Sequence, residues 1–187
     1  MPLIFIIGPP AAGKMTVGQA LARRTGYKLF HNHVAIEVVA PFFSYGTRQG
    51  RKLVSQIRSA FFEAFAADTD NGYIFTFVWA FGEPGERAFI EGVADQFRSA
   101  GHGIYWVELE TAFEERLRRN RGENRLAHKP TKRDIEWSEG HFREIEETYR
   151  FNSLPGELGY ENYLRIDNTH LSATEVSDEI CAVFELA

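Results

Sequence analysis

Apolar runs alternate with amphipathic segments along most of the chain. Five short runs rich in β-branched and aromatic residues predict strands, at Leu3–Ile7, Tyr27–Phe30, Tyr73–Trp79, Ile104–Leu109 and Tyr163–Ile166. Apolar residues at helical spacing predict helices between and after them, at Lys14–Thr25, Val34–Phe43, Arg48–Asp68, Glu86–Ala100, Thr111–Asn120, Asp134–Asn152 and about Ser172–Leu186. Strands that are apolar throughout and alternate with helices are typical of a parallel sheet covered on both faces. The pattern therefore predicts an α/β fold, a three-layer doubly wound sheet of about five parallel strands with helices on both faces.

Length and composition fit one globular domain. The 187 residues are 44% hydrophobic and 25% charged, so we expect residues 1–187 to form a single domain. The net charge of −5 argues against general nucleic-acid binding. The single cysteine, Cys181, lies in an apolar helical pattern, which favours a buried and inert thiol. No apolar stretch has the length of a membrane span and no basic leader precedes the first strand, so we expect a cytoplasmic protein without a membrane partner.

A phosphate-binding loop follows the first predicted strand. Nine residues read G-x-x-x-x-G-K-x-T, namely Gly8, Pro9, Pro10, Ala11, Ala12, Gly13, Lys14, Met15 and Thr16. A turn of small residues points successive backbone N–H groups at phosphate oxygens, and the following helix adds its N-terminal donors and dipole. Lys14 supplies a mobile cation for the β- and γ-phosphates. Because the motif lies between a buried strand and a helix, we expect these nine residues to bind a nucleotide.

The residue after Lys14 departs from the usual loop. Ser or Thr at this position ligates Mg²⁺, whereas this chain has Met15, with Thr16 one place later. A thioether is a poor ligand for a hard cation, so Mg²⁺ has to be held by water, by phosphate oxygens and by a carboxylate elsewhere. The form of the loop resembles that of adenylate kinases, and this resemblance implies that the displaced Thr contacts phosphate. The loop is therefore more similar to that of a small kinase than to that of a GTPase.

An arginine-rich segment follows the fourth predicted strand. Residues 116–133 contain eight of the chain's 21 Lys and Arg residues and one carboxylate, Glu123. Phe113 and Leu117, four residues apart, can dock the start of this segment as a helix. The rest has few apolar anchors and is interpreted as a mobile lid at about residues 120–133. Phosphoryl transfer requires positive charge over the transferring group and exclusion of water, so an arginine-rich lid is favoured over a solvated basic helix.

These features resemble the nucleoside-monophosphate kinase and shikimate kinase group of P-loop kinases, and more closely still bacterial proteins described as shikimate kinase-like. The resemblance rests on the loop, on the strand and helix at Val107–Arg119, on the lid-like segment at residues 121–133, and on the last strand with its loop at Arg165–Thr169. It implies a fold of the P-loop NTPase type, with ATP and Mg²⁺ as cofactors.

The same resemblance assigns roles to four further residues. It places Arg116 beside the adenine, Arg121 and Arg125 at the phosphates, and Asn168 in the loop that passes the adenine. These roles are carried over from the group and do not follow from the spacing.

The second predicted strand ends in His31, Asn32 and His33, with Glu37 just beyond. Shikimate kinase-like proteins have D-x-D followed by I-E at this place. The I-E pair matches here, but histidines replace both aspartates, which does not fit a shikimate acceptor. A histidine can orient or deprotonate a hydroxyl or bind an anion, or simply pack with one hydrogen bond. We expect these four residues to contact the acceptor, with His31 and His33 as catalytic candidates.

The end of the third predicted strand adds weaker signals. Arg87 can hold an anionic group of the acceptor, whereas Trp79 and Phe81 can stack on a ring or belong to the core. No Asp closes this strand, so the ligand for the metal is unassigned. Three carboxylates are candidates for it, Glu37, Glu83 and Glu108.

The sequence therefore predicts an ATP-dependent phosphotransferase that acts on a small metabolite or a nucleotide-like acceptor. The alternative is a nucleotide-binding, ATP-hydrolysing regulatory module without a small-molecule acceptor, which the Met15 substitution and the missing strand-end Asp favour. A third interpretation, a kinase for RNA ends that uses the basic segment, conflicts with the acidic net charge. The identity of the acceptor, the choice between ATP and GTP, and the oligomeric state do not follow from these residues.

Overall fold

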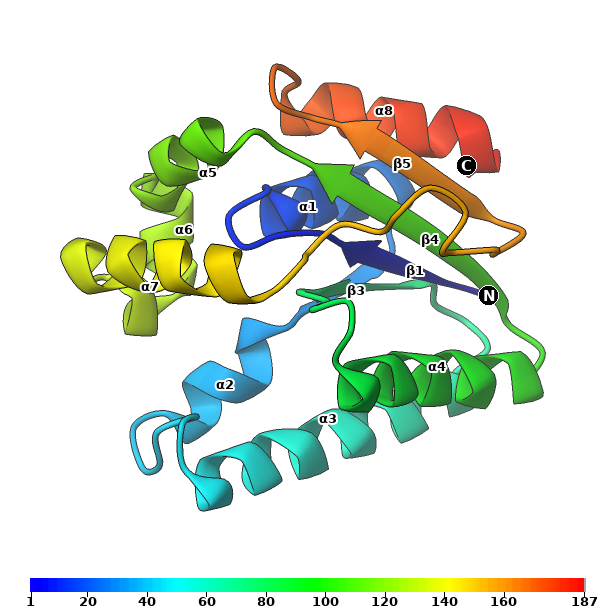
Figure 1. Cartoon of the computed structure of the whole chain (residues 1–187). Coiled ribbons are helices and arrows are strands. Elements are labelled where there is room, and N and C mark those ends of the chain that lie inside the picture. Colours follow the sequence, from blue (N-terminus) through cyan, green and yellow to red (C-terminus); the bar gives the residue numbers. More distant parts are fainter. Residues whose placement is uncertain (187) are drawn as a thin grey trace.

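A five-stranded parallel sheet with helices on both faces forms the centre of the molecule (Figure 1). The computed structural model describes residues 1–186, with the side chain of Lys132 left out. The strands are β1 (Pro2–Ile7), β2 (Lys28–His31), β3 (Tyr73–Phe77), β4 (Gly103–Glu110) and β5 (Tyr163–Asp167). They lie in the order β2-β3-β1-β4-β5, and every pair is parallel. The predicted three-layer α/β fold is confirmed.

The helices form two covering layers and a cluster at one end of the sheet (Figure 1). They are α1 (Lys14–Thr25), α2 (His33–Val39), α3 (Arg48–Ala67), α4 (Pro84–Ser99), α5 (Phe113–Asn120), α6 (Glu123–His128), α7 (Ile135–Thr148) and α8 (Ala173–Phe184), with a short 3₁₀ helix η1 (Pro130–Lys132). Helices α1 and α8 cover one face, α3 and α4 cover the other, and α2 and α5–α7 lie beyond the carboxyl ends of the strands. None of the helices in the described residues is long and apolar enough to cross a membrane.

The central strand β1 is buried on both faces because its residues alternate between two cores. Leu3, Phe5 and Ile7 belong to the core that includes Phe62 of α3 and Phe97 of α4. The intervening residues of β1 belong to the core formed with α1 and α8. This arrangement places the loop after β1 at the carboxyl edge of the sheet. At this position the strand order reverses direction: β3 and β2 lie on one side of β1, and β4 and β5 lie on the other.

Gly8, the first residue of that loop, is required by the packing of its neighbours. Its φ is 138°, a backbone conformation that favours glycine, and a Cβ atom there would lie 2.5 Å from the Leu109 carbonyl oxygen of β4. The loop can therefore lie directly against β4 because it has no side chain at this position.

The predicted lid segment contains helical structure that the sequence pattern did not indicate. Residues 120–133 contain α6 and η1, although no residue of α6 is buried. The pattern missed α6 because this helix has no apolar face, and its contacts come from polar side chains. The helix predicted at Val34–Phe43 is also shorter than expected and ends at Val39, two residues before Pro41.

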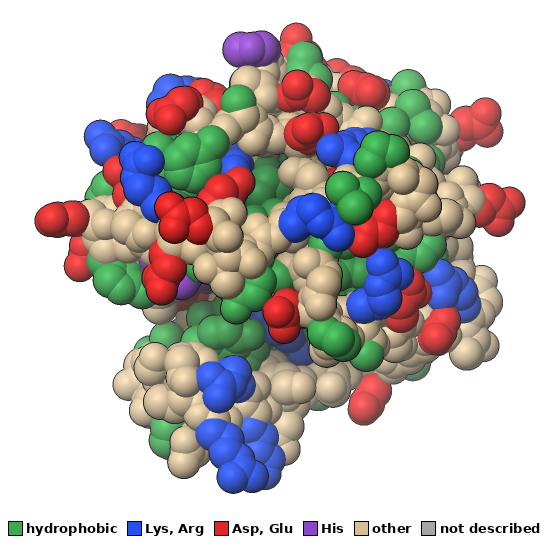
Figure 2. All heavy atoms as spheres, viewed as in Figure 1, with side chains coloured by type: hydrophobic (Ala, Val, Ile, Leu, Met, Phe, Trp, Pro, Cys, Tyr) green, Lys and Arg blue, Asp and Glu red, His purple; other side chains and the backbone are tan. Residues whose placement is uncertain are grey.

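Helix α2 and the start of α3 form a lobe below the body of the molecule (Figure 2). The lobe carries exposed apolar residues, Val38, Phe42, Phe43 and Tyr45. A hollow separates it from the helices above, and histidine is visible at its edge in Figure 2.

Candidate active site

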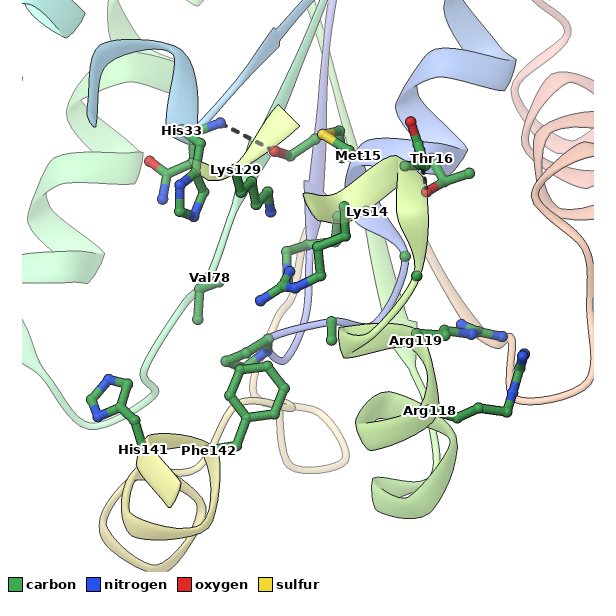
Figure 3. A pocket seen from close by; sticks show the side chains of 18 of the residues that line it. Lys14, Met15, Thr16, His33, Val78, Arg118, Arg119, Lys129, His141 and Phe142 are labelled. Carbon is green, nitrogen blue, oxygen red and sulfur yellow. Dashed lines mark hydrogen bonds between the residues drawn. The ribbon is translucent and has the colours of Figure 1, made fainter. Parts of the chain in front are cut away.

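A cavity of about 390 Å³ lies between the loop after β1, the ends of β2 and β3, and helices α5–α7. Its lining is cationic: it includes Lys14, Arg118, Arg119, Arg125 and Lys129. His33 and His141 line it as well, whereas none of the lining residues within residues 1–186 is Asp or Glu. Figure 3 shows Lys14 and Lys129 on one side of this cavity and His141 and Phe142 of α7 on the other. Such a cavity suits a polyanion and disfavours a cationic ligand.

The loop after β1 curls around the amine of Lys14. Ala11 and Gly13 have positive φ angles of 59° and 93°, and both residues line the cavity. Lys14 Nζ donates to the carbonyl oxygens of Gly8 (2.6 Å) and Pro9 (2.5 Å). Burial, together with repulsion from neighbouring cations, holds the pKa of Lys14 well below its usual value. An anion in the loop would relieve this repulsion, so the site is electrostatically prepared for phosphate.

The loop is held from behind by a small polar network. The Ala12 carbonyl oxygen accepts from Asn168 Nδ2 (2.8 Å) and Arg119 Nη1 (3.1 Å). Thr111 Oγ1 in turn donates to Asn168 Oδ1 (2.5 Å). Asn168 is 2% exposed, so its side chain supports the loop instead of facing the cavity. Arg119 also donates to the carbonyl oxygens of Asn168 and Thr169, and it ties α5 to the loop that follows β5.

Replacing Asn168 with alanine is expected to destabilise the protein by about 1–3 kcal/mol, because buried partners lose their hydrogen bonds. The loop carbonyl of Ala12 would also be less well held, so we expect weaker ATP binding in the same variant. Urea unfolding and calorimetry measure the two effects. Asn71→Ala, which removes a bond to Asp68 at the opposite end of the sheet, should leave ATP affinity unchanged. Equal ATP affinity in both variants would contradict a supporting role for Asn168.

Most arginines of the basic segment are neutralised by carboxylates from other parts of the sequence. Arg116 is buried and forms a two-bond ion pair with Glu146 of α7, so it lies outside the cavity lining. Arg121 is exposed and pairs with Glu139, which also belongs to α7. Glu115 accepts hydrogen bonds from both Arg118 and Arg119. The pairs of Arg116 and Arg121 anchor α5 and the start of the lid to α7, and neither guanidinium lines the cavity.

Arg125 is the arginine of the predicted lid that lines the cavity. Its Nε donates to Asn120 Oδ1 (2.8 Å), and its guanidinium lies 5.5 Å from the centre of the Phe142 ring. Burial lowers the pKa of Arg125 to about 10, so its charge is retained at neutral pH. It is positioned to meet a phosphate group held by the loop.

His33 lines the cavity and forms a pair with a carboxylate. Its Nδ1 lies 3.0 Å from Glu37 Oε1, one helical turn further along α2. The same carboxylate oxygen accepts from Thr131 Oγ1 of the lid (2.7 Å). Burial opposes ionisation of Glu37, but hydrogen bonds from His33 and Thr131 outweigh it and hold the pKa of Glu37 below its usual value. The structure therefore brings two predicted site residues, His33 and Glu37, into one unit.

His31 lies next to this unit but is not part of the cavity lining. Its Nδ1 is buried and has no hydrogen-bond partner within the described structure, and its ring packs edge-on against that of His128 at 6.4 Å. Burial and the nearby charges of Lys129 and His128 lower the pKa of His31 to about 4. The ring is therefore neutral at neutral pH.

This low pKa predicts a pH dependence of folding. In the unfolded chain His31 binds a proton with the ordinary histidine pKa of 6.5, whereas in the folded protein its pKa is about 4. Stability that is present at neutral pH is therefore lost as the pH falls through this window. His31→Asn should make the free energy of unfolding less sensitive to pH between these values, as measured by urea unfolding. His170→Asn, at an exposed position, is the control, and an equal flattening in both variants would contradict the assignment.

The sequence analysis did not single out Arg58 of α3, which is not a lining residue of the cavity but is bonded to Asn32, which lines it. This arginine is 6% exposed and forms no ion pair with a carboxylate in the described part of the chain. Its Nη2 donates to the Asn32 carbonyl oxygen (3.3 Å), while its Nε and the Asn32 side-chain oxygen are buried without partners. Burial lowers the pKa of Arg58. Its signal in the sequence is a single cation on the buried face of the helix, at the position between Val54 and Phe62.

The remaining sequence candidates lie away from the cavity lining. Trp79 and Phe81 are core residues that stack on each other, and Arg87 lies over the Trp79 ring. Glu108 is fully buried and accepts hydrogen bonds from Asn152, Ser153 and Tyr163, so its oxygens are occupied. Glu83 is exposed at the start of α4.

The residues around the loop do not form a metal site of their own. The described residues contain no group of three or more His, Cys, Asp or Glu side chains that could hold a metal ion. Met15 lines the cavity, and the side-chain oxygens of its lining are neutral: they are the hydroxyls of Thr16 and Thr76, each accepting a hydrogen bond, and the amides of Asn32 and Asn124. Protein ligation of Mg²⁺ by a carboxylate therefore does not fit this cavity.

Comparisons with solved structures show the fold. The structure of a gluconokinase from Sinorhizobium meliloti matches with a TM-score of 0.57 and 16% identity, over 98% of this chain and 91% of that chain. Shikimate kinase from Acinetobacter baumannii, in complex with shikimate, matches with a TM-score of 0.53 and 18% identity, over 99% and 93%. Kti12 from Chaetomium thermophilum, in complex with ADP-AlF3, matches with a TM-score of 0.59 and 16% identity, over 100% of both chains. No protein-family model matches the chain, and no curated protein matches its sequence. These likenesses show the fold alone, and they confirm the predicted α/β fold of the P-loop NTPase type.

Proposed function

We propose that this protein is an ATP-dependent phosphotransferase that transfers the γ-phosphoryl group to a hydroxyl of a small anionic acceptor. One observation carries the proposal: a single cationic cavity is lined both by the phosphate loop with Lys14 and by His33, which is paired with Glu37. The loop and Lys14 have the chemistry to hold a polyphosphate, and the His33–Glu37 pair has that of a general base. The kinase folds that match the chain support the same reaction class.

On the nucleotide side, the loop N–H groups surround the phosphates, and Lys14 exchanges its two backbone carbonyls for phosphate oxygens. Arg125 lies close enough to the cavity to neutralise charge on the transferring group. Arg118 and Arg119 line the cavity as well, and they replace Arg116 as candidates for contact with the base. Because the protein offers no carboxylate in this lining, Mg²⁺ would enter with ATP, held by phosphate oxygens and water.

On the acceptor side, His33 is the proposed general base. A hydrogen bond from Nδ1–H to Glu37 puts the other ring nitrogen, Nε2, in the form that accepts a proton. As the acceptor oxygen attacks the γ-phosphorus, its proton passes to Nε2 and the bond to the β–γ bridging oxygen breaks. The charge that develops on ADP is balanced by Lys14 and Arg125.

Arg58 is the proposed anchor for an anionic group of the acceptor. A buried guanidinium that lacks a carboxylate partner in the described structure is costly in the free protein. A carboxylate or phosphate would supply the missing charge and the missing acceptor for Arg58 Nε. This favours an acceptor that carries both a hydroxyl and an anionic group.

The test is thermal unfolding of the protein with Mg²⁺ and a non-hydrolysable ATP analogue, with a panel of small hydroxylated compounds added. A true acceptor binds the folded state and should raise the midpoint beyond that of the analogue alone. We expect the stabilising compounds to be anionic and their effect to disappear in Arg58→Met. Stabilisation by neutral polyols or amines alone would contradict the proposed acceptor class.

A regulatory ATP-hydrolysing module is the second candidate function. The methionine in place of the Mg²⁺-binding hydroxyl and the cavity lining without a carboxylate favour slow turnover. The fold is shared with Kti12, a protein solved in complex with ADP-AlF3, as well as with the kinases. Slow ATP hydrolysis that no compound of the panel changes would support it over the kinase.

A further inference from the structure

The lid and the acceptor side meet at one carboxylate oxygen. Glu37 Oε1 accepts a hydrogen bond from Thr131 Oγ1 at 2.7 Å and lies 3.0 Å from His33 Nδ1. His33 and Glu37 belong to α2, and both side chains are largely buried. Thr131 comes from η1, 94 residues further along the chain, and is exposed. The predicted lid is therefore bonded to the same carboxylate, Glu37, that is paired with the proposed base His33.

The lid is fastened at a second place, on the nucleotide side. Asn124 Nδ2 of α6 donates to Gln19 Oε1 (2.9 Å) and Thr16 Oγ1 (3.2 Å) of α1. The lid thus bridges α1, which carries the phosphate loop, and α2, which carries the acceptor pair. Both contacts are polar and exposed, and α6 has no buried residue. Such contacts cost little to break, so the lid can open without disturbing the core.

The shared oxygen couples the two donors chemically. Each donor stabilises the negative charge of Glu37, so each weakens the hydrogen bond between the carboxylate and the other donor. When Thr131 is bonded, the carboxylate is less basic and holds the His33 proton less strongly. Further charged or titratable groups face this unit: His31 from β2, His128 and Lys129 from the lid, and His141 from α7.

We propose that Thr131 is a latch: its hydrogen bond to Glu37 forms when the lid closes, and the same bond adjusts His33 as a base. Glu37 is then a positioning residue that fixes the ring of His33, and Thr131 tunes it through the same oxygen. The inference rests on the proposed function for its catalytic meaning, but the coupling itself is a property of the free protein. It would ensure that the base is adjusted for proton transfer when the lid excludes water from the cavity.

Titration of His33 by NMR of the imidazole nitrogens tests the coupling, in the free protein and with Mg²⁺ and a non-hydrolysable ATP analogue. The signals of the six histidines are assigned with single His→Asn variants. In Glu37→Gln, the pKa of His33 should fall by about 1 unit or more, because the carboxylate charge is lost. In Thr131→Val it should rise, because the carboxylate then acts on His33 alone. Thr131→Ser keeps the donor and should behave as wild type.

Thr148→Val is the matched control, since this hydroxyl bonds to a backbone carbonyl on the outside of α7. It should leave the titration of His33 unchanged. Shifts of opposite sign in Glu37→Gln and Thr131→Val support the latch. Shifts in the same direction, or no shift in Thr131→Val, overturn it. The free-protein titration needs neither ATP nor acceptor, so a failure of ATP binding refutes the proposed function while leaving this result to stand or fall separately.

Discussion

Replacing Lys14 with alanine is expected to weaken binding of Mg·ATP by about 100-fold or more, the equivalent of losing charge-assisted hydrogen bonds to two phosphates. In the free protein, Lys14 is buried against the carbonyl oxygens of Gly8 and Pro9 and is repelled by neighbouring cations. A bound polyphosphate provides it with a better partner. Isothermal titration calorimetry with the non-hydrolysable analogue measures the loss of affinity.

Lys28→Ala is the matched control for this prediction. Lys28 is an exposed cation at the amino end of β2, on the side of the sheet opposite the loop. Its removal changes the net charge equally but should leave ATP affinity near that of wild type. If Lys14→Ala binds the analogue as tightly as Lys28→Ala, the loop is not a nucleotide site.

Replacing Arg58 with methionine is expected to reduce acceptor-dependent transfer by about 100-fold or more while leaving ATP affinity intact. The variant should also be at least as stable as wild type, because an apolar side chain of similar length replaces a buried charge without a carboxylate partner among the described residues. Loss of function together with retained stability is typical of a site residue, whereas replacing a structural residue lowers stability. Steady-state kinetics with the acceptor from the panel measure the loss of transfer, and urea unfolding measures the stability of the variant.

Arg51→Met provides the comparison on the same helix. Arg51 is exposed and donates to the Gly46 carbonyl oxygen at the tip of the lobe. It should affect neither transfer nor ATP binding. A marked fall in the stability of Arg58→Met would indicate that the buried guanidinium supports the fold, and it would remove the basis for the anionic acceptor.

The sheet and the phosphate loop could be predicted from local patterns. The central strands β1 and β3 are almost entirely apolar runs because both of their faces are buried, and helices with apolar residues at helical spacing follow in the sequence. The loop motif consists of consecutive residues, so it can be recognised from a short stretch of sequence. Even caps were readable: Ser172 and Glu175 form the capping box at the start of α8.

The distribution of charge was not readable in the same way. Counting residues 116–133 alone leaves one carboxylate against eight cations, yet Glu115, Glu139 and Glu146 lie outside this window and pair with its arginines. Spacing along the chain does not show which carboxylates fold back onto a segment. In the structure Arg118, Arg119, Arg125 and Lys129 line the cavity, whereas Arg116 and Arg121 lie outside its lining.

The acceptor side was predicted in part. Glu37 lies on the helix predicted at Val34–Phe43, whereas His33 was placed just before it. Because α2 begins at His33, the two residues are one helical turn apart and can pair. Thr131 and Arg58 come from elements distant in the sequence, and no local pattern marks them. Both became visible through contacts: a shared carboxylate oxygen for Thr131, and buried atoms without partners for Arg58.

Transfer of radiolabelled γ-phosphate from ATP, followed in a single turnover with the compound that stabilises the analogue complex most, tests the central claim most directly. We predict that the label appears in the phosphorylated acceptor much faster than in inorganic phosphate, and that both Lys14→Ala and Arg58→Met abolish this transfer. Label that appears only in inorganic phosphate, at a rate independent of the compound, would contradict the account and identify the protein as an ATP-hydrolysing module.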